Sequence, residues 1–204
     1  MTDFARLMND YFVKYLAGQK GSGSNTMKTY RDTFVQLLEF MNEKKHIRAD
    51  CIEVDSFSYD IINEFLEYLE KEKGVSISTR NNRLAAIRSF FKYTGYHEPK
   101  YLNISSSIRE ISKKKTEGRQ MNYLSVNAME HFLNSFDKTD HKELRCFCIV
   151  LLLYESGARV TELCNVRRYD LHLEKPYTMI LHGKGDKIRS VPLDGLVADV
   201  ISNY

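Results

Sequence analysis

The stretch that decides the fold of the C-terminal part of the chain is IVLLLYESGARVTELCNVRRYDLHLEKPYTMILHGKGDKIRSVPL, residues 149–193. Its apolar start is too short to span a membrane and ends at Ser156-Gly157, which predicts a buried helix followed by a break. A second helix then begins at Arg159, where a guanidinium lies close to backbone N–H groups that also attract anions. The stretch therefore opens as a helix, a turn and a second helix that starts on a cation.

The end of the same stretch, residues 178–193, alternates apolar and polar side chains on either side of Gly183-Lys184-Gly185-Asp186. Alternation around a glycine-rich turn predicts a β-hairpin, with Lys184 carried on its tip. A nucleotide-binding P-loop is excluded, because the GxxxxGK[ST] spacing is absent and the lysine follows a strand instead of opening a helix.

Two segments of this stretch, SGARVTEL (156–163) and HGKGDKIRSVPL (182–193), resemble the tyrosine recombinase (phage integrase) family. The resemblance implies that Arg159 is the first catalytic arginine of that family and that Lys184 is its catalytic lysine. Glu162 follows Arg159 by three residues, so on a helix it shares a face with the arginine and is expected to orient it.

The resemblance implies site-specific strand exchange in DNA, in which a tyrosine hydroxyl attacks a phosphodiester and no metal or other cofactor is needed. Because the transition state spreads negative charge over the phosphate oxygens, preorganised cations are the main catalytic device. Arg159 suits this task because its planar guanidinium can bind two oxygens and is always charged. Lys184 suits a general acid for the departing 5′ oxygen. Asp186, Lys187 and Arg189 are expected to contact phosphate or solvent without a catalytic role.

Other parts of the family's catalytic set are missing from the sequence. None of the six histidines is followed three residues later by arginine, and there is no tryptophan. Tyr204 comes before the expected His-x-x-Arg segment, and Tyr154, Tyr169 and Tyr177 are interpreted as packing residues. We therefore expect no nucleophile and no metal site in this chain, a truncated catalytic domain over residues 121–204, and no DNA cleavage by the chain alone.

Residues 1–98 are expected to form a helical bundle, because apolar residues recur at helical spacing in four successive segments. The segments TMKTYRDTFVQLLEF and STRNNRLAAIRSFFKYT resemble the SAM-like core-binding domain of the same family, whose corresponding helices lie against DNA. The predicted fold is mainly α with a small antiparallel sheet (α+β): a core-binding bundle followed by part of a recombinase catalytic domain with a β-hairpin.

The charge distribution predicts a DNA surface in and after the fourth helical segment. Residues 33–75 carry ten acidic and five basic residues, whereas residues 76–120 carry ten basic and three acidic ones, which favours a polyanionic partner on one surface. Residues 99–120 are interpreted as an exposed basic interdomain linker, because they combine a proline, a serine run and a run of three lysines at 113–115. The residues expected to bind DNA are Lys28, Arg31, Arg80, Asn81, Arg83, Arg88, Lys92, Lys113, Lys114 and Lys115.

The bulk composition, with 204 residues, 43% hydrophobic and 28% charged, is ordinary for a globular protein. The first residues include Asp3 and no apolar segment, so no secretory signal is expected. The four cysteines show no metal-binding spacing and are interpreted as reduced thiols, which predicts a cytoplasmic protein. The expected partner is double-stranded DNA, with the full-length enzyme forming a tetramer on two DNA sites. Neither a membrane nor a small-molecule ligand is expected.

Two other functions remain open. The chain could be a non-catalytic DNA-binding module that occupies recombination sites and competes with a complete enzyme, which sequencing beyond codon 204 would test. It could also be a helical protein–protein module without a DNA role. Duplex binding that weakens as salt rises would exclude the second alternative, because a surface that binds phosphates releases counterions.

Overall fold

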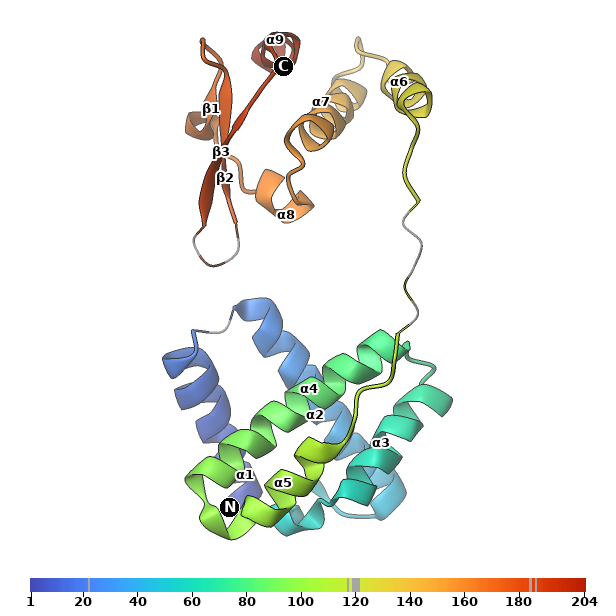
Figure 1. The fold of residues 1–204 in the computed structure, drawn as a ribbon, viewed down its shortest axis with the longest axis vertical. Coiled ribbons are helices and arrows are strands. Elements are labelled where there is room, and N and C mark those ends of the chain that lie inside the picture. The colour runs from blue at the N-terminus through green and yellow to red at the C-terminus, as the bar shows by residue number, and fades with distance from the viewer. Residues whose placement is uncertain (22, 117, 119–121, 184, 186) are drawn as a thin grey trace. The chain divides into compact units, whose positions relative to one another are not determined.

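The structure is a computed structural model that describes residues 1–21, 23–116, 118, 122–183, 185 and 187–204. It divides into two compact units, Met1–Arg119 and Gln120–Tyr204 (Figure 1). Two residues singled out from the sequence, Lys184 and Asp186, lie outside the described residues.

The N-terminal unit is a bundle of helices whose starts follow local capping chemistry. Ser58 and Ser76 are the N-caps of the third and fourth long helices. Their side chains accept hydrogen bonds from the backbone N–H groups of Ile61 and Thr79. The predicted four-helix pattern is confirmed and a fifth helix follows it. The elements are α1 (Asp3–Asp10), the π-helix η1 (Tyr11–Gln19), α2 (Ser24–Lys45), the 3-10 turns η2 (Ala49–Cys51) and η3 (Val54–Ser56), α3 (Tyr59–Lys71), α4 (Ile77–His97), the 3-10 turn η4 (Pro99–Tyr101) and α5 (Leu102–Glu110).

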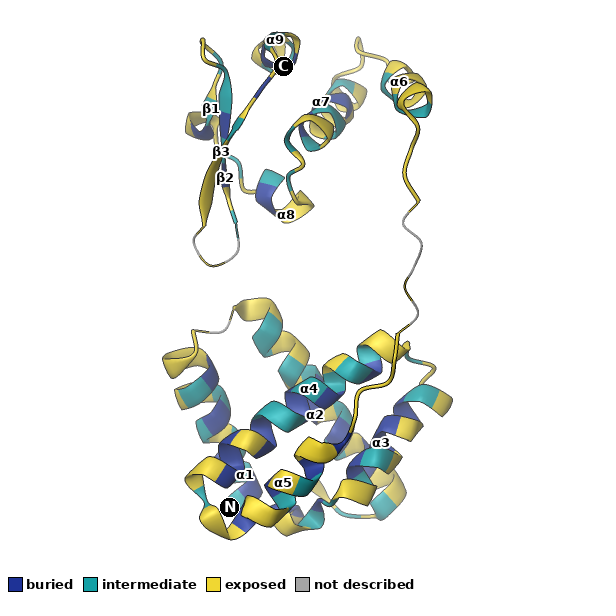
Figure 2. Ribbon diagram, in the orientation of Figure 1, coloured by how far each residue is buried: buried dark blue, intermediate teal, exposed yellow. Residues whose placement is uncertain are grey.

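The core of this unit is built around aromatic side chains on α4, which is dark blue along much of its length in Figure 2. Phe90 is fully buried, and its ring lies 5.5 Å from Phe4, 5.4 Å from Tyr11 and 5.2 Å from Phe34, mostly edge to face. The Tyr11 hydroxyl donates to Ser89 Oγ at 2.8 Å, so its polar end is satisfied inside the bundle. One aromatic residue thus joins α1, η1, α2 and α4.

The prediction that residues 99–120 form an exposed linker is wrong for the first half of that range. Residues 99–110 are helical and pack on α4, and Ile108 and Ile111 are buried in the bundle core. The serine run misled the prediction because one serine is a packing residue: Ser105 is buried and its hydroxyl donates to the Phe91 carbonyl. A Cβ atom at Gly95 would lie 2.6 Å from Ser105 Oγ, so the absence of a side chain there permits the close approach of α5.

The C-terminal unit combines helices with a three-stranded antiparallel sheet of order β1-β2-β3. The predicted hairpin is confirmed: β2 and β3 pair with Met179 opposite Val191 and Leu181 opposite Arg189. Met179 and Leu181 face the core of the unit and are fully buried. The elements are α6 (Val126–Asn134), α7 (His141–Ser156), α8 (Val160–Leu163), the 3-10 turn η5 (Arg168–Asp170), β1 (Leu171–His172), β2 (Thr178–His182), β3 (Ile188–Pro192) and α9 (Gly195–Asn203).

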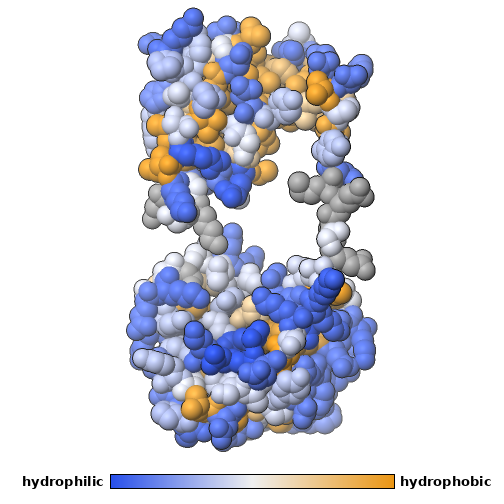
Figure 3. Space-filling model, in the orientation of Figure 1, coloured by the Kyte–Doolittle hydropathy of each residue, from blue (hydrophilic) through white to orange (hydrophobic). Residues whose placement is uncertain are grey.

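The prediction of a buried helix before Gly157 is only half right. On α7, Cys148 and Leu152 are buried, whereas Ile149 is 41% and Tyr154 55% exposed. α7 packs on α6, α8 and α9, and Ile149 and Tyr154 leave part of its apolar surface exposed. Apolar residues are visible at the surface of this unit in Figure 3, where they are orange.

None of the helices described in the structure is long and apolar enough to cross a membrane.

Candidate functional site

The first candidate site is a cluster in which one carboxylate holds two arginines. Gly157 ends α7 with a positive φ of 58°, a conformation that glycine adopts without strain, and Arg159 is the N-cap of the short helix α8. Glu162 Oε2 accepts the backbone N–H of Arg159 at 3.0 Å, and Glu162 Oε1 accepts its Nη1 at 2.7 Å. The prediction that Glu162 orients Arg159 agrees with this geometry.

The second arginine of the cluster is Arg189 on β3, to which sequence reasoning assigned only contacts with phosphate or solvent. Its Nη2 donates to Glu162 Oε2 at 2.7 Å and its Nη1 donates to Oε1 at 3.2 Å, a two-point pairing across 27 residues. The sequence carries only a weak signal for this role, because only the tertiary structure brings Arg189 on β3 beside Glu162 on α8.

Hydrogen bonds from two arginines keep Glu162 ionised despite its burial. The carboxylate side chain is only 3% exposed, and its pKa is lowered to about 2 by the hydrogen bonds from Arg189, from the Arg159 backbone and from the Arg159 side chain. The side chain of Arg159 remains 73% exposed. The arrangement therefore fixes one end of the Arg159 guanidinium inside the protein and leaves the rest open to an anion.

The hairpin meets this cluster where β2 ends and the turn begins. A Cβ atom on Gly183 would lie 3.2 Å from Glu162 Oε1, so the backbone at this position passes directly beside the carboxylate. The buried Asp170 also holds this region: its Oδ2 accepts the Arg167 N–H at 2.8 Å, and its Oδ1 lies 3.1 Å from His182 Nε2. The Arg167 hydrogen bond, followed by His182, lowers the pKa of Asp170. The Asp170 and His182 contact was not anticipated from the sequence.

The tyrosines that were interpreted as packing residues differ from one another. Tyr177 is half-buried against the core of the C-terminal unit, as expected. Tyr154 and Tyr169 are 55% and 77% exposed, so the packing interpretation is wrong for both. Tyr204 follows α9, and its ring lies 5.5 Å from that of His141.

The second candidate site is the set of basic residues on the N-terminal unit, and the structure separates it into two groups. Six cations are available at the surface, because no hydrogen bond or close ion pair ties them to another described side chain. Arg31 is 73% exposed and its nearest carboxylate, Asp32, is 3.9 Å away. Arg88 is half-buried. The six available cations are Lys28, Arg31, Arg88, Lys92, Lys113 and Lys115.

The other four residues expected to bind DNA are engaged within the protein. Arg80 is 5% exposed, which leaves it almost no surface to offer a phosphate. Arg83 Nη1 donates to the Thr29 carbonyl at 3.0 Å and to Thr33 Oγ1 at 3.2 Å, and so ties α4 to α2. The remaining two, Asn81 and Lys114, bond to each other.

Within the described residues, no group of three or more His, Cys, Asp or Glu side chains is placed to hold a metal ion.

Comparison with known proteins places both units in one class. Residues 10–95 match the model of the phage integrase N-terminal SAM-like domain, and residues 122–204 match that of the phage integrase family. Together these two matches cover most of the chain, in the order expected from the sequence. The chain belongs to the tyrosine recombinase (phage integrase) family.

Similar full-length proteins are considerably longer. The putative integrase/recombinase y4rC of Sinorhizobium fredii is 28% identical over 98% of this chain, which covers 60% of that protein. The tyrosine recombinase XerC of Staphylococcus carnosus is 27% identical over 97% of this chain, which covers 63% of that protein.

Solved structures share the fold. The XerH site-specific recombinase bound to palindromic difH substrate matches with a TM-score of 0.67 and 23% identity, covering 93% of this chain and 55% of that one. The Tn1549 transposon integrase in complex with transposon right end DNA matches with a TM-score of 0.66 and 19% identity, covering 95% and 63%.

Proposed function

We propose that this chain acts in site-specific DNA recombination, binding duplex DNA through its N-terminal bundle and holding a phosphodiester with Arg159. The observation that carries the proposal is the Arg159, Glu162 and Arg189 cluster, in which a buried carboxylate fixes an arginine that stays 73% exposed. An arginine held in this way needs little reorganisation when charge develops on a phosphate, which is how preorganised cations lower a barrier.

The division of hydrogen bonds within the cluster supports this role. Arg159 uses Nη1 for Glu162, so its other guanidinium donors remain available for two phosphate oxygens. Both terminal nitrogens of Arg189 donate hydrogen bonds to Glu162, so Arg189 holds the carboxylate in place. The general-acid role of Lys184 remains a proposal that rests on the resemblance.

Cleavage needs a nucleophile, and we propose that the 204 residues alone do not supply it. The sequence has no His-x-x-Arg segment, and the ring of Tyr204, after α9, lies 5.5 Å from that of His141 at the start of α7. We further propose that the complete enzyme works as a tetramer on two DNA sites in the cytoplasm, where the four free cysteines stay reduced.

The test uses the 204-residue chain and a duplex suicide substrate carrying a recombination site. Saturable binding without a covalent adduct is expected, and a phosphotyrosyl adduct would disprove the lack of cleavage. On adding duplex, the Nε–H resonance of Arg159 is expected to shift, whereas Arg159→Gln loses this response. The Nε–H resonance of Arg168, another exposed arginine of the same unit, serves as the matched control in the same spectra. Absence of duplex binding at low salt would refute the DNA-binding function itself.

A second candidate function is a non-catalytic module that occupies recombination sites, which the missing His-x-x-Arg segment favours. The two functions differ when the chain is mixed with a complete recombinase acting on the same site. A competitor inhibits strand exchange by the complete recombinase when it occupies the sites stoichiometrically. A chain that takes part in catalysis instead restores strand exchange when a separate C-terminal segment is supplied.

A further inference from the structure

The start of the interdomain segment is held against the bundle by Asn81. The Asn81 amide donates through Nδ2 to the Lys114 carbonyl at 2.8 Å, and its Oδ1 accepts the Lys114 N–H at 3.1 Å. One side chain therefore satisfies both backbone groups of Lys114, as a neighbouring strand would in a β-ladder. Residues 112–115 have no helical or strand structure of their own, so side-chain contacts with the bundle, this one among them, hold the segment in place.

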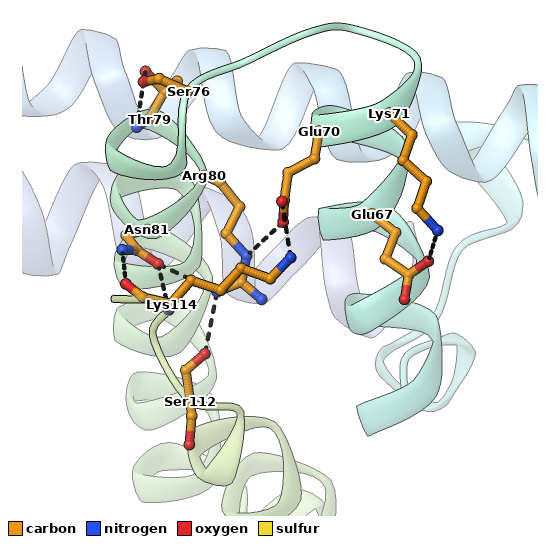
Figure 4. A network of polar contacts seen from close by, with 9 residues as sticks. All are labelled: Glu67, Glu70, Lys71, Ser76, Thr79, Arg80, Asn81, Ser112 and Lys114. Atoms are coloured by element: carbon orange, nitrogen blue, oxygen red, sulfur yellow. Dashed lines mark hydrogen bonds and ion pairs between the residues drawn. The ribbon is translucent and has the colours of Figure 1, made fainter. Parts of the chain in front are cut away.

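Two charged residues from α3 and α4 hold the same segment (Figure 4). The buried Arg80 donates through Nη1 to the Ser112 carbonyl at 3.1 Å and to Asn81 Oδ1 at 3.3 Å. Glu70 lies 3.3 Å from Arg80 Nε through one oxygen and accepts from Lys114 Nζ at 2.8 Å through the other. The carboxylate thus balances a buried guanidinium and a linker lysine at the same time.

We propose that Asn81, Arg80 and Glu70 form a clamp that fixes residues 112–114 on the N-terminal unit. The three clamp residues position the basic segment instead of contacting DNA. Lys114 is the clamped residue, and the exposed Lys113 and Lys115 on either side of it are the cations offered to phosphate. Because the clamp orders the segment before binding, DNA does not have to bear the entropy cost of ordering it.

The clamp makes a prediction that does not depend on DNA. The Lys114 amide is expected to exchange its hydrogen slowly in the intact chain. Asn81→Ala removes both hydrogen bonds to the Lys114 backbone and is expected to speed the exchange of this amide by about tenfold or more. Asn82→Ala is the matched control, since Asn82 is the adjacent, exposed asparagine on the same helix. Tryptic cleavage at residues 113–115 is expected to accelerate in the same variant only.

A purely structural role for Asn81 would raise exchange throughout the bundle. The amides of Phe65 and Leu66 in the core of α3 are therefore measured in the same spectra and are expected to keep their protection in Asn81→Ala. If the Lys114 amide exchanges at the same rate in the intact chain and in Asn81→Ala, the clamp does not exist.

The last step of the inference rests on the proposed DNA-binding function and is tested with adjacent lysines. In duplex binding measured against salt concentration, Lys113→Gln is expected to make the slope of log K against log salt shallower by about 0.9, the value for one phosphate contact. Lys114→Gln is expected to leave the slope unchanged while it speeds exchange at the clamp. A shallower slope in Lys114→Gln would overturn the assignment of Lys114 to the clamp. Failure of every variant to bind duplex would refute the DNA function and leave the exchange result standing.

Discussion

Replacing Arg88 by glutamine removes one of the six cations that the N-terminal unit holds available at its surface. Its guanidinium has no hydrogen-bond or ion-pair partner among the described residues, so the substitution breaks no polar contact between them. If all six available cations reach phosphates, the slope of log K against log salt is about −5, since each contact contributes about −0.9. The affinity of the intact chain then falls by roughly a thousandfold between about 50 and 200 mM salt.

Removal of one contact is expected to make the slope shallower by about 0.9, so that Arg88→Gln loses roughly threefold less affinity over the same salt range. The matched control is Arg83→Gln on the same helix, because Arg83 is bonded to Thr29 and Thr33 inside the protein. Arg83→Gln is expected to lower the free energy of unfolding and to leave the slope unchanged.

The assay is fluorescence anisotropy of a labelled duplex at five or more salt concentrations, with each variant checked for folding by circular dichroism. An unchanged slope for Arg88→Gln would refute the division of the basic residues into available and engaged groups. A shallower slope for Arg83→Gln would refute it equally.

Three further predictions concern stability. Because the pKa of Glu162 is held at about 2, below its ordinary value of 4.5, its ionised form stabilises the C-terminal unit fully above pH 4.5, and this contribution is lost as the pH falls from 4.5 toward 2. Glu162→Gln is expected to remove that pH dependence from the exchange of the buried Leu181 amide, whereas Glu174→Gln at an exposed position keeps it; equal curves for the intact chain and Glu162→Gln would contradict the pairing. Gly95→Ala is expected to lower the free energy of unfolding by about 1 to 2 kcal/mol, because the cost of displacing Ser105 exceeds the gain in helix propensity. Urea unfolding measures this loss, and adding Ser105→Gly is expected to restore stability; no recovery in the double variant argues against the contact. Phe90→Ala is expected to cost about 3 to 5 kcal/mol in the N-terminal unit and to leave the C-terminal unit folded, which calorimetry of the intact chain resolves; a loss of both transitions together would show that the units unfold as one.

Local sequence signals were sufficient for most of the secondary structure. The hairpin was predicted because strand alternation and a glycine-rich turn act over a few residues, and the four helices because their apolar spacing is a local pattern as well. The fifth helix was missed for a related reason. A serine run resembles a linker unless Gly95, ten residues earlier, is known to face Ser105.

The functional residues divide along the same line. The sequence by itself determined the family, the Arg159 and Glu162 pair and the existence of a basic region, because each depends on residues close together in the chain. Only the tertiary structure decided that Arg189 shares Glu162, and that Arg80 and Asn81 hold the start of the linker. Those contacts join residues 27 to 33 positions apart. A charge pattern counts cations, but whether a cation meets a carboxylate, a backbone carbonyl or a phosphate depends on which elements the fold brings beside it.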